Sequence, residues 1–206
     1  MGRIFERAEP YLDQLGPGRF VEIGTSRNGD DGSTVIIAKW AKQYSRSGWL
    51  TTVDADPANC EFVRAMNLDK VEIVNKKGED YLKDDFPFHT DYISFLYLDN
   101  FDWDWHPDRT EDFVREQQER YTELGMQMTN VNSQSAHLLQ AVQAVRGLAE
   151  TSLVVCDDTW YNPHWGQYCG KSGAVVPFLL GHGFEVLYTE EQPVYGTILG
   201  RGIKWH

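Results

Sequence analysis

The sequence FVEIGTSRNGDDGST, at residues 20–34, decides the fold class of this chain. It begins with a short apolar strand pattern at residues 20–23, continues through a glycine-rich segment, and ends where a helical pattern begins at Ser33. Glycines allow the backbone to turn tightly and to approach a ligand closely. A strand, a glycine-rich turn and a helix in this order are typical of a βαβ unit, whose strands are parallel.

The same pattern recurs along the chain. Further strands are expected at residues 50–53, 71–74, 92–98 and 153–156, with helices at residues 33–44, 57–66 and 133–148. Near-continuous apolar runs of this kind are typical of buried parallel strands. A helix at residues 173–180 and two strands at residues 184–188 and 194–199, joined by a polar hairpin connection, are expected to follow. The predicted fold is α/β: a single Rossmann-like, doubly wound domain with a mostly parallel seven-stranded sheet and a C-terminal antiparallel hairpin.

One domain is expected for the whole chain, residues 1–206, because a second core would lack residues to fill it. Within it, residues 101–132 form an insertion between the fourth strand and the next helix. Its residues 110–124 have the pattern of a polar helix with a narrow apolar stripe. Long connections in compact domains are usually functional. We expect this insertion to form either a lid or an oligomer contact. In the second case the protein would be a homodimer.

The charge balance excludes several classes of partner. The chain has 19 Lys and Arg against 31 Asp and Glu, a net charge of −12, which repels the phosphates of nucleic acids. It has no apolar run near the roughly 20 residues that a membrane span needs. The start of the chain lacks the apolar stretch of a secretory signal, and its three cysteines show no CxxC pair. No nucleic-acid or membrane partner is therefore expected, and the expected location is cytoplasmic.

Acidic side chains follow the predicted strands, at the edge of the sheet where open parallel sheets bind ligands. They are Asp54 after the second strand, Glu79 and Asp80 after the third, Asp99 and Asp102 after the fourth, and Asp157 and Asp158 after the fifth. A carboxylate can accept two hydrogen bonds from a ribose diol. Neither the GxGxxG pattern of dinucleotide-binding proteins nor the GxxxxGK[ST] pattern of P-loops is present.

In these motifs the chain resembles the class I S-adenosylmethionine-dependent methyltransferases, from Phe20 to Leu199. The resemblance implies that residues 20–25 are the family's first motif, that Asp54 binds the ribose hydroxyls, and that Glu79 and Asp80 lie near the adenine. The cofactor-binding residues expected in this way are Glu22, Gly24, Thr25, Ser26, Ser33, Asp54, Glu79, Asp80 and Asp99. The loop at residues 24–32 is longer than is usual in the family, and Ser33 is expected to cap the following helix.

Asp99, Asp157 and Asp158 resemble the metal site of the metal-dependent O-methyltransferases, both the catechol type and the type that acts on sugars of natural products. Mg²⁺ prefers hard oxygen ligands. Because consecutive strand residues point to opposite faces, Asp157 and Asp158 reach one ion only if the strand ends between them. Residues 159–165 are then expected to form a loop. A bound Mg²⁺ would acidify and orient a substrate hydroxyl.

Asp102 and His164 are the candidate catalytic bases, with Lys171 and His106 as further candidates. In the catechol type a lysine follows the metal ligand of the fourth strand, whereas here Asp102 stands in its place.

Tryptophans are expected to form the walls of the acceptor pocket, because a flat apolar side chain suits an organic acceptor. Four of them follow the two strands with the expected metal ligands: Trp103, Trp105, Trp160 and Trp165. The expected acceptor is a small hydroxylated molecule, either a phenol or a sugar-type natural product, methylated with S-adenosylmethionine and Mg²⁺. A metal-independent methyltransferase, a nicotinamide-dependent oxidoreductase and a non-catalytic nucleoside-binding module are the alternatives.

Overall fold

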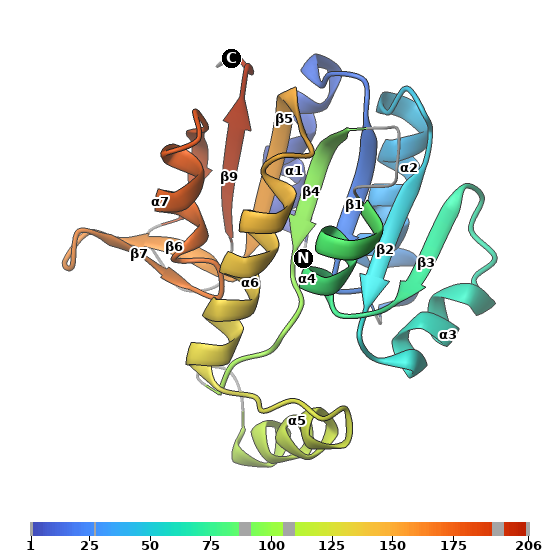
Figure 1. The fold of residues 1–206 in the computed structure, drawn as a ribbon, viewed down its shortest axis with the longest axis vertical. Coiled ribbons are helices and arrows are strands. Elements are labelled where there is room, and N and C mark those ends of the chain that lie inside the picture. The colour runs from blue at the N-terminus through green and yellow to red at the C-terminus, as the bar shows by residue number, and fades with distance from the viewer. Residues whose placement is uncertain (1, 27, 87–91, 105–109, 191–195, 205–206) are drawn as a thin grey trace.

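Seven strands form one sheet in the order β3-β2-β1-β4-β5-β9-β8 (Figure 1). The computed structural model describes residues 2–26, 28–86, 92–104, 110–190 and 196–204. The strands of the sheet are β1 (Arg19–Ile23), β2 (Leu50–Asp54), β3 (Val71–Asn75), β4 (Ile93–Leu98), β5 (Leu148–Asp157), β8 (Glu185–Thr189) and β9 (Gly196–Arg201).

The first five of these strands run parallel, and β9 pairs antiparallel with both β5 and β8. This confirms the predicted fold class, a mostly parallel seven-stranded sheet with a C-terminal antiparallel pair. The chain moves from β1 outward to β2 and β3, and then returns to place β4 on the other side of β1. Such a reversal of strand order opens a crevice at the carboxyl ends of the strands, where ligands bind in this type of sheet.

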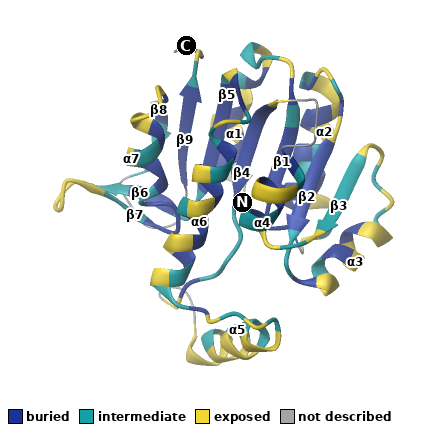
Figure 2. Ribbon diagram, in the orientation of Figure 1, coloured by how far each residue is buried: buried dark blue, intermediate teal, exposed yellow. Residues whose placement is uncertain are grey.

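Helices cover both faces of the sheet. The α-helices of the structure are α1 (Gly2–Ala8), α2 (Ser33–Tyr44), α3 (Pro57–Ala65), α4 (Gly78–Asp80), α5 (Glu111–Glu123), α6 (Asn130–Ala144) and α7 (Val175–Leu180). On one face, α6, α7 and the short π-helix Tyr81–Asp85 after α4 enclose an apolar core, and on the other α1 and α2 enclose a second. Figure 2 shows the central strands buried between these layers and α5 largely exposed below them.

The helix α6 differs from its predicted form in its ends and in its buried face. The apolar face expected from the sequence contained Leu138, Leu139, Val142 and Val145, but Leu139 and Val142 are exposed. The buried side chains are Ser133, Ala136, His137, Gln140, Ala141 and Ala144. The small members of this set allow α6 to pack closely against α4 and the sheet, which the apolar pattern alone does not indicate. α6 also ends at Ala144, because β5 begins at Leu148 rather than at residue 153.

A separate hairpin replaces the expected loop after the fifth strand. β6 (Thr159–Asn162) and β7 (Gln167–Gly170) pair antiparallel and project from the body of the molecule (Figure 1). The interpretation of residues 159–165 as a loop was therefore wrong, since Thr159 to Asn162 form a strand.

Some expectations fall on residues outside the described part of the chain. Residues 191–195 contain most of the predicted polar connection, and Trp105 and His106 lie in the segment 105–109. None of the described helices has the length and apolar character that crossing a bilayer requires.

Candidate active site

A cavity of about 400 Å³ lies at the carboxyl ends of β1, β2, β4 and β5, and α5 forms part of its wall. Most of the expected site residues line it: Gly24, Thr25, Ser26, Asp54, Glu79, Asp99, Asp102, Asp157 and Asp158. Four expected site residues do not line it: Glu22, Ser33, Asp80 and His164. The fold thus brings together acidic side chains from four strand ends that are distant in the sequence.

Glu22 lies beneath the glycine-rich loop rather than in the cavity. Its carboxylate is fully buried and accepts hydrogen bonds from Ser33 Oγ at 2.6 Å and from Thr34 Oγ1 and Thr52 Oγ1 at 2.7 Å each. Burial raises the pKa of Glu22 to about 7. In this position Glu22 joins β1 to β2 and to the start of α2 and does not line the cavity. Ser33 likewise donates to Glu22, and Gly32 rather than Ser33 is the N-cap residue of α2.

Gly24 allows the loop after β1 to pass against the end of β4. Its φ is +101°, and a Cβ atom there would lie 2.6 Å from the backbone N of Asn100 and the backbone C and O of Asp99. A side chain is excluded by both the dihedral angle and the contact. The loop continues through Thr25 and Ser26, whose buried side chains lie at the cavity wall. The backbone of the loop is therefore exposed to a ligand beside Asp99.

Asp54, at the end of β2, is held in place by three donors. Its Oδ2 accepts hydrogen bonds from Thr25 N and Asn59 Nδ2, both at 3.0 Å, and its Oδ1 accepts from Asp56 N at 2.8 Å. Burial raises the pKa of Asp54. A carboxylate has about four acceptor positions, so one remains for a ligand hydroxyl.

Glu79 and Asp80 both follow β3 but lie differently. Glu79 lines the cavity and accepts a hydrogen bond from Gln140 Nε2 at 3.2 Å. Asp80 is the last residue of α4 and is half-buried outside the cavity lining. Of this pair, only Glu79 therefore lines the cavity.

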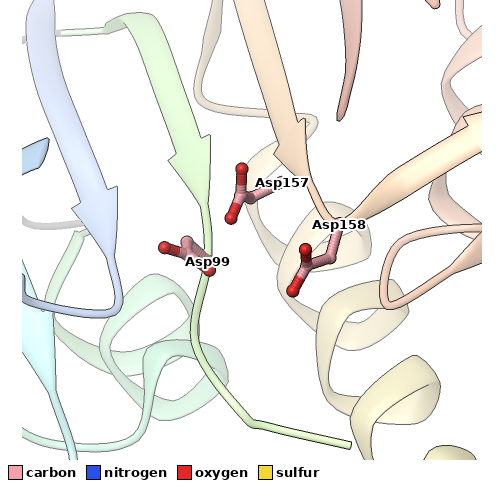
Figure 3. Close-up of side chains that lie close together, drawn as sticks. All are labelled: Asp99, Asp157 and Asp158. Carbon is pink, nitrogen blue, oxygen red and sulfur yellow. The ribbon is translucent and has the colours of Figure 1, made fainter. Parts of the chain in front are cut away.

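Three carboxylates face one another between the ends of β4 and β5 (Figure 3). Asp99, Asp157 and Asp158 each offer one oxygen within 4.8 Å of the other two. β5 ends at Asp157, and Asp158 has a φ of +47°, a left-handed turn conformation that aspartate tolerates. The strand therefore ends between the two residues, as the metal interpretation required. Burial and the charges of Asp99 and Asp158 raise the pKa of Asp157 well above its usual value, so the cluster holds excess negative charge.

Lys171, predicted only as a further candidate base, lies against this cluster. It follows β7, its side chain is only 4% exposed, and its Nζ lies 3.0 Å from Asp99 Oδ1 and 2.9 Å from Asp158 Oδ2. The charges of Asp158 and Asp99 hold the pKa of Lys171 well above its usual value, against the effect of burial. In the sequence, the only indication of this contact is that a cationic residue directly follows a glycine. The strand β7, which places Lys171, was not predicted.

The two candidate bases are separated by the fold. Asp102 lines the cavity, and its backbone N–H donates to Tyr121 Oη of α5 at 2.6 Å. His164 lies in the exposed turn between β6 and β7, where its backbone N–H donates to Asn162 Oδ1 at 3.0 Å. Figure 1 shows that this hairpin points away from the strand ends, and His164 does not line the cavity.

The three described tryptophans of the expected acceptor wall lie outside the cavity lining. Trp103 and Trp160 are buried and pack against each other with ring centroids 5.6 Å apart, whereas Trp165 is 64% exposed at the hairpin turn. Trp105 lies outside the described residues. None of the three described tryptophans lines the cavity.

The helix α5 closes one side of the cavity through an ion pair. Arg120 binds the carboxylate of Asp56, at the start of α3, through Nε, and its Nη2 donates to Asn59 Oδ1 at 2.8 Å. The side chains of Phe113, Gln117 and Tyr121 on the same helix also line the cavity. The helix predicted at residues 110–124 is thus present, beside the cavity, with Thr110 as its N-cap.

Comparisons with known proteins identify solved structures with a similar fold. No model of a known protein family matches the sequence, and no curated protein is similar to it. Among solved structures, the N-methyltransferase NodS from Bradyrhizobium japonicum is 11% identical, with a TM-score of 0.53 over 99% of this chain and 95% of NodS. An rRNA methylase from Streptococcus thermophilus is 8% identical, with a TM-score of 0.51 over 98% of both chains. The O-methyltransferase from Bacillus cereus in complex with SAH is 13% identical, with a TM-score of 0.51 over 95% of this chain and 78% of that one.

These structures share the fold of this chain and differ in the acceptors that their names give. At such identities the likeness establishes the fold alone. The chemistry of this chain is therefore inferred from the residues that line its own cavity.

Proposed function

We propose that this protein is an S-adenosylmethionine-dependent methyltransferase that methylates a hydroxyl group of a small acceptor with the help of a divalent cation. The observation that carries the proposal is the group Asp99, Asp157 and Asp158, at the edge of a cavity whose other end holds Asp54. The shared fold with NodS and the Bacillus cereus O-methyltransferase supports the choice of cofactor.

The cofactor would lie along the strand ends from β1 to β3. The loop backbone after Gly24 would receive its methionine part, while the free acceptor position of Asp54 suits a ribose hydroxyl. Glu79 lies within reach of the nucleoside end of the cavity. S-adenosylmethionine, when bound, supplies an activated methyl group, so the protein mainly has to orient the acceptor.

The donor set of the carboxylate cluster fits a hard divalent cation. Its three aspartates offer oxygen ligands, and a bound cation would offset the burial and mutual repulsion that together raise the pKa of Asp157. Mg²⁺, when bound, lowers the pKa of a hydroxyl that it contacts. Asp102 lies in the same cavity, where its carboxylate is the candidate acceptor for the hydroxyl proton.

A small acceptor suits the charge of the cavity. Among the described residues, seven acidic side chains line it, namely Asp54, Asp56, Glu79, Asp99, Asp102, Asp157 and Asp158, against the three cations Lys77, Arg120 and Lys171. Together with the net charge of −12, this lining repels a phosphate backbone. The similarity to an rRNA methylase nevertheless makes RNA a necessary arm of any acceptor panel.

Metal-independent methyl transfer is the second candidate. The observation that favours it is Lys171, which already brings a positive charge to Asp99 and Asp158. The metal-assisted and the metal-independent candidates both use S-adenosylmethionine. Only the metal-assisted one should lose activity when a chelator removes the metal.

Calorimetric titration with S-adenosylhomocysteine tests the assignment of the cofactor. We expect stoichiometric binding to the wild type and weakened binding to Asp54→Ala. NADH serves as the competing ligand, and binding of NADH without S-adenosylhomocysteine would support an oxidoreductase instead.

Methyl transfer to phenols, sugars and RNA, measured with and without EDTA, tests the acceptor and the metal. We expect transfer to a small hydroxyl compound that EDTA and Asp157→Ala both abolish. Activity that survives both treatments would favour the metal-independent candidate, and cofactor binding without turnover on any acceptor would favour a binding module.

A further inference from the structure

Lys171 is held at the carboxylate cluster by its backbone as well as by its side chain. Its N–H donates to the carbonyl oxygen of Asp158 at 3.1 Å, and the N–H of Ser172 donates to Thr159 Oγ1 at 3.1 Å. The preceding Gly170 has a φ of +92°, and a Cβ atom there would lie 1.9 Å from the carbonyl oxygen of Asp158. This contact is possible only for glycine, so the hairpin is built to place Lys171 beside Asp158.

The ammonium group binds the same carboxylates that would hold a metal. Its two contacts, at 3.0 and 2.9 Å, are to Asp99 and Asp158, two of the three members of the cluster. Charges this close and this well buried interact strongly, because little water screens them. A divalent cation that approached the cluster would therefore find the Lys171 ammonium already paired with Asp99 and Asp158, two of its expected ligands.

The cavity also holds a third acidic side chain that acts on the ammonium. Asp102 lines the same cavity, and its negative charge acts on Lys171 together with those of Asp158 and Asp99. A lysine side chain displaced from Asp99 and Asp158 would therefore still have an acidic side chain, Asp102, in the same cavity.

We propose that Lys171 is the resident cation of the carboxylate cluster and that a divalent cation binds there only by displacing its ammonium group. Lys171 therefore sets the affinity of the cluster for metal. This inference rests on the proposed metal site and concerns how that site is filled.

Calorimetric titration with Mn²⁺ of the wild type, Lys171→Met and Lys171→Arg tests the proposal directly. Lys171→Met keeps the side-chain length without the charge, so we expect it to bind Mn²⁺ at least tenfold more tightly than the wild type. Lys171→Arg keeps the charge and should bind no more tightly than the wild type. Lys42→Met is the matched control, because it also removes one positive charge but from an exposed pair with Asp69. It should change the affinity less than twofold.

Equal or weaker Mn²⁺ binding by Lys171→Met would overturn the proposal. If neither protein binds Mn²⁺ while both bind S-adenosylhomocysteine, the metal site and this inference fail together, and the methyltransferase assignment stands. If the wild type does not bind Mn²⁺ and Lys171→Met does, the ammonium group is the sole obstacle, as proposed.

A measurement on the wild type keeps the proposal testable if Lys171→Met does not fold. A buried, doubly paired ammonium group exchanges its protons slowly, so Lys171 should give a ¹⁵Nζ resonance that is absent in Lys171→Arg. We expect addition of Mg²⁺ to shift or abolish this resonance with the midpoint of calorimetric Mg²⁺ binding. A resonance that is unchanged when the site is saturated would contradict displacement.

Discussion

The carboxylate of Glu22 accepts a 2.6 Å hydrogen bond from Ser33 Oγ, and this contact joins the first strand of the sheet to the first turn of α2. Hydroxyls of Thr34 and Thr52 complete the surroundings of the carboxylate, which has no solvent exposure. The glycine-rich loop between β1 and α2 is thus supported from below by a buried acid rather than by an apolar side chain.

The pH dependence of stability should reveal this buried acid. The folded protein raises the pKa of Glu22 from 4.5 to about 7, so the native state keeps a proton that the unfolded chain releases. The free energy of unfolding should therefore fall as the pH rises from 4.5 to 7, by about 3 kcal/mol in total. Urea unfolding across this range should show the fall in the wild type and a shallower fall in Glu22→Gln, which keeps the raised pKa values of Asp54 and Asp157. The same slope in both proteins would contradict the assignment.

Gly24→Ala should destabilise the protein and disrupt the cavity. Its Cβ would meet the backbone of Asp99 and Asn100 at 2.6 Å, at a φ of +101°. We expect a loss of about 3 kcal/mol from strain and overpacking together. Gly183→Ala is the matched control, because Gly183 also has a positive φ but no atom within 4 Å of its Cβ position, and it should lose about 1 kcal/mol. Urea unfolding and titration with S-adenosylhomocysteine measure both effects, and equal losses would argue against the contact.

Arg120→Gln should accelerate the release of bound S-adenosylhomocysteine. The Arg120 guanidinium joins α5 to Asp56 and Asn59 at the start of α3, across the cavity. Loss of a charge-assisted contact of this kind should raise the dissociation rate about tenfold if α5 is a lid. Arg115→Gln, which removes an exposed pair with Asp112 on the same helix, should leave the rate unchanged. Stopped-flow fluorescence measures the rate, and identical values for both variants would exclude the lid.

Substitution of the two candidate bases should have opposite outcomes. His164 lies in the exposed hairpin turn, so His164→Ala should retain methyl transfer within about twofold. Asp102 lines the cavity, so Asp102→Asn should lower kcat by about 100-fold if its carboxylate takes up a proton. Steady-state assays on the acceptor found by the panel measure both. A large loss in His164→Ala would require the hairpin to fold over the cavity.

The strands and the acids after them could be predicted because both depend on neighbouring residues. Apolar runs of four to seven residues identified the parallel strands, and the residues that followed them reached one edge of the sheet, where Asp54, Asp99, Asp157 and Asp158 line one cavity. The buried face of α6 could not be read in this way, since close packing selected its small and polar side over Leu139 and Val142.

The sequence by itself determined the α/β class, the course of the parallel sheet and the acidic character of its ligand-binding edge, because periodicity and strand ends are local properties. Only the tertiary structure decided which charges meet there. Lys171 reaches Asp99 across 72 positions in the sequence, and Arg120 reaches Asp56 across 64. The first contact depends on the position of the β6–β7 hairpin relative to the sheet, and the second on the position of the inserted helix α5. Both positions are set by packing throughout the molecule.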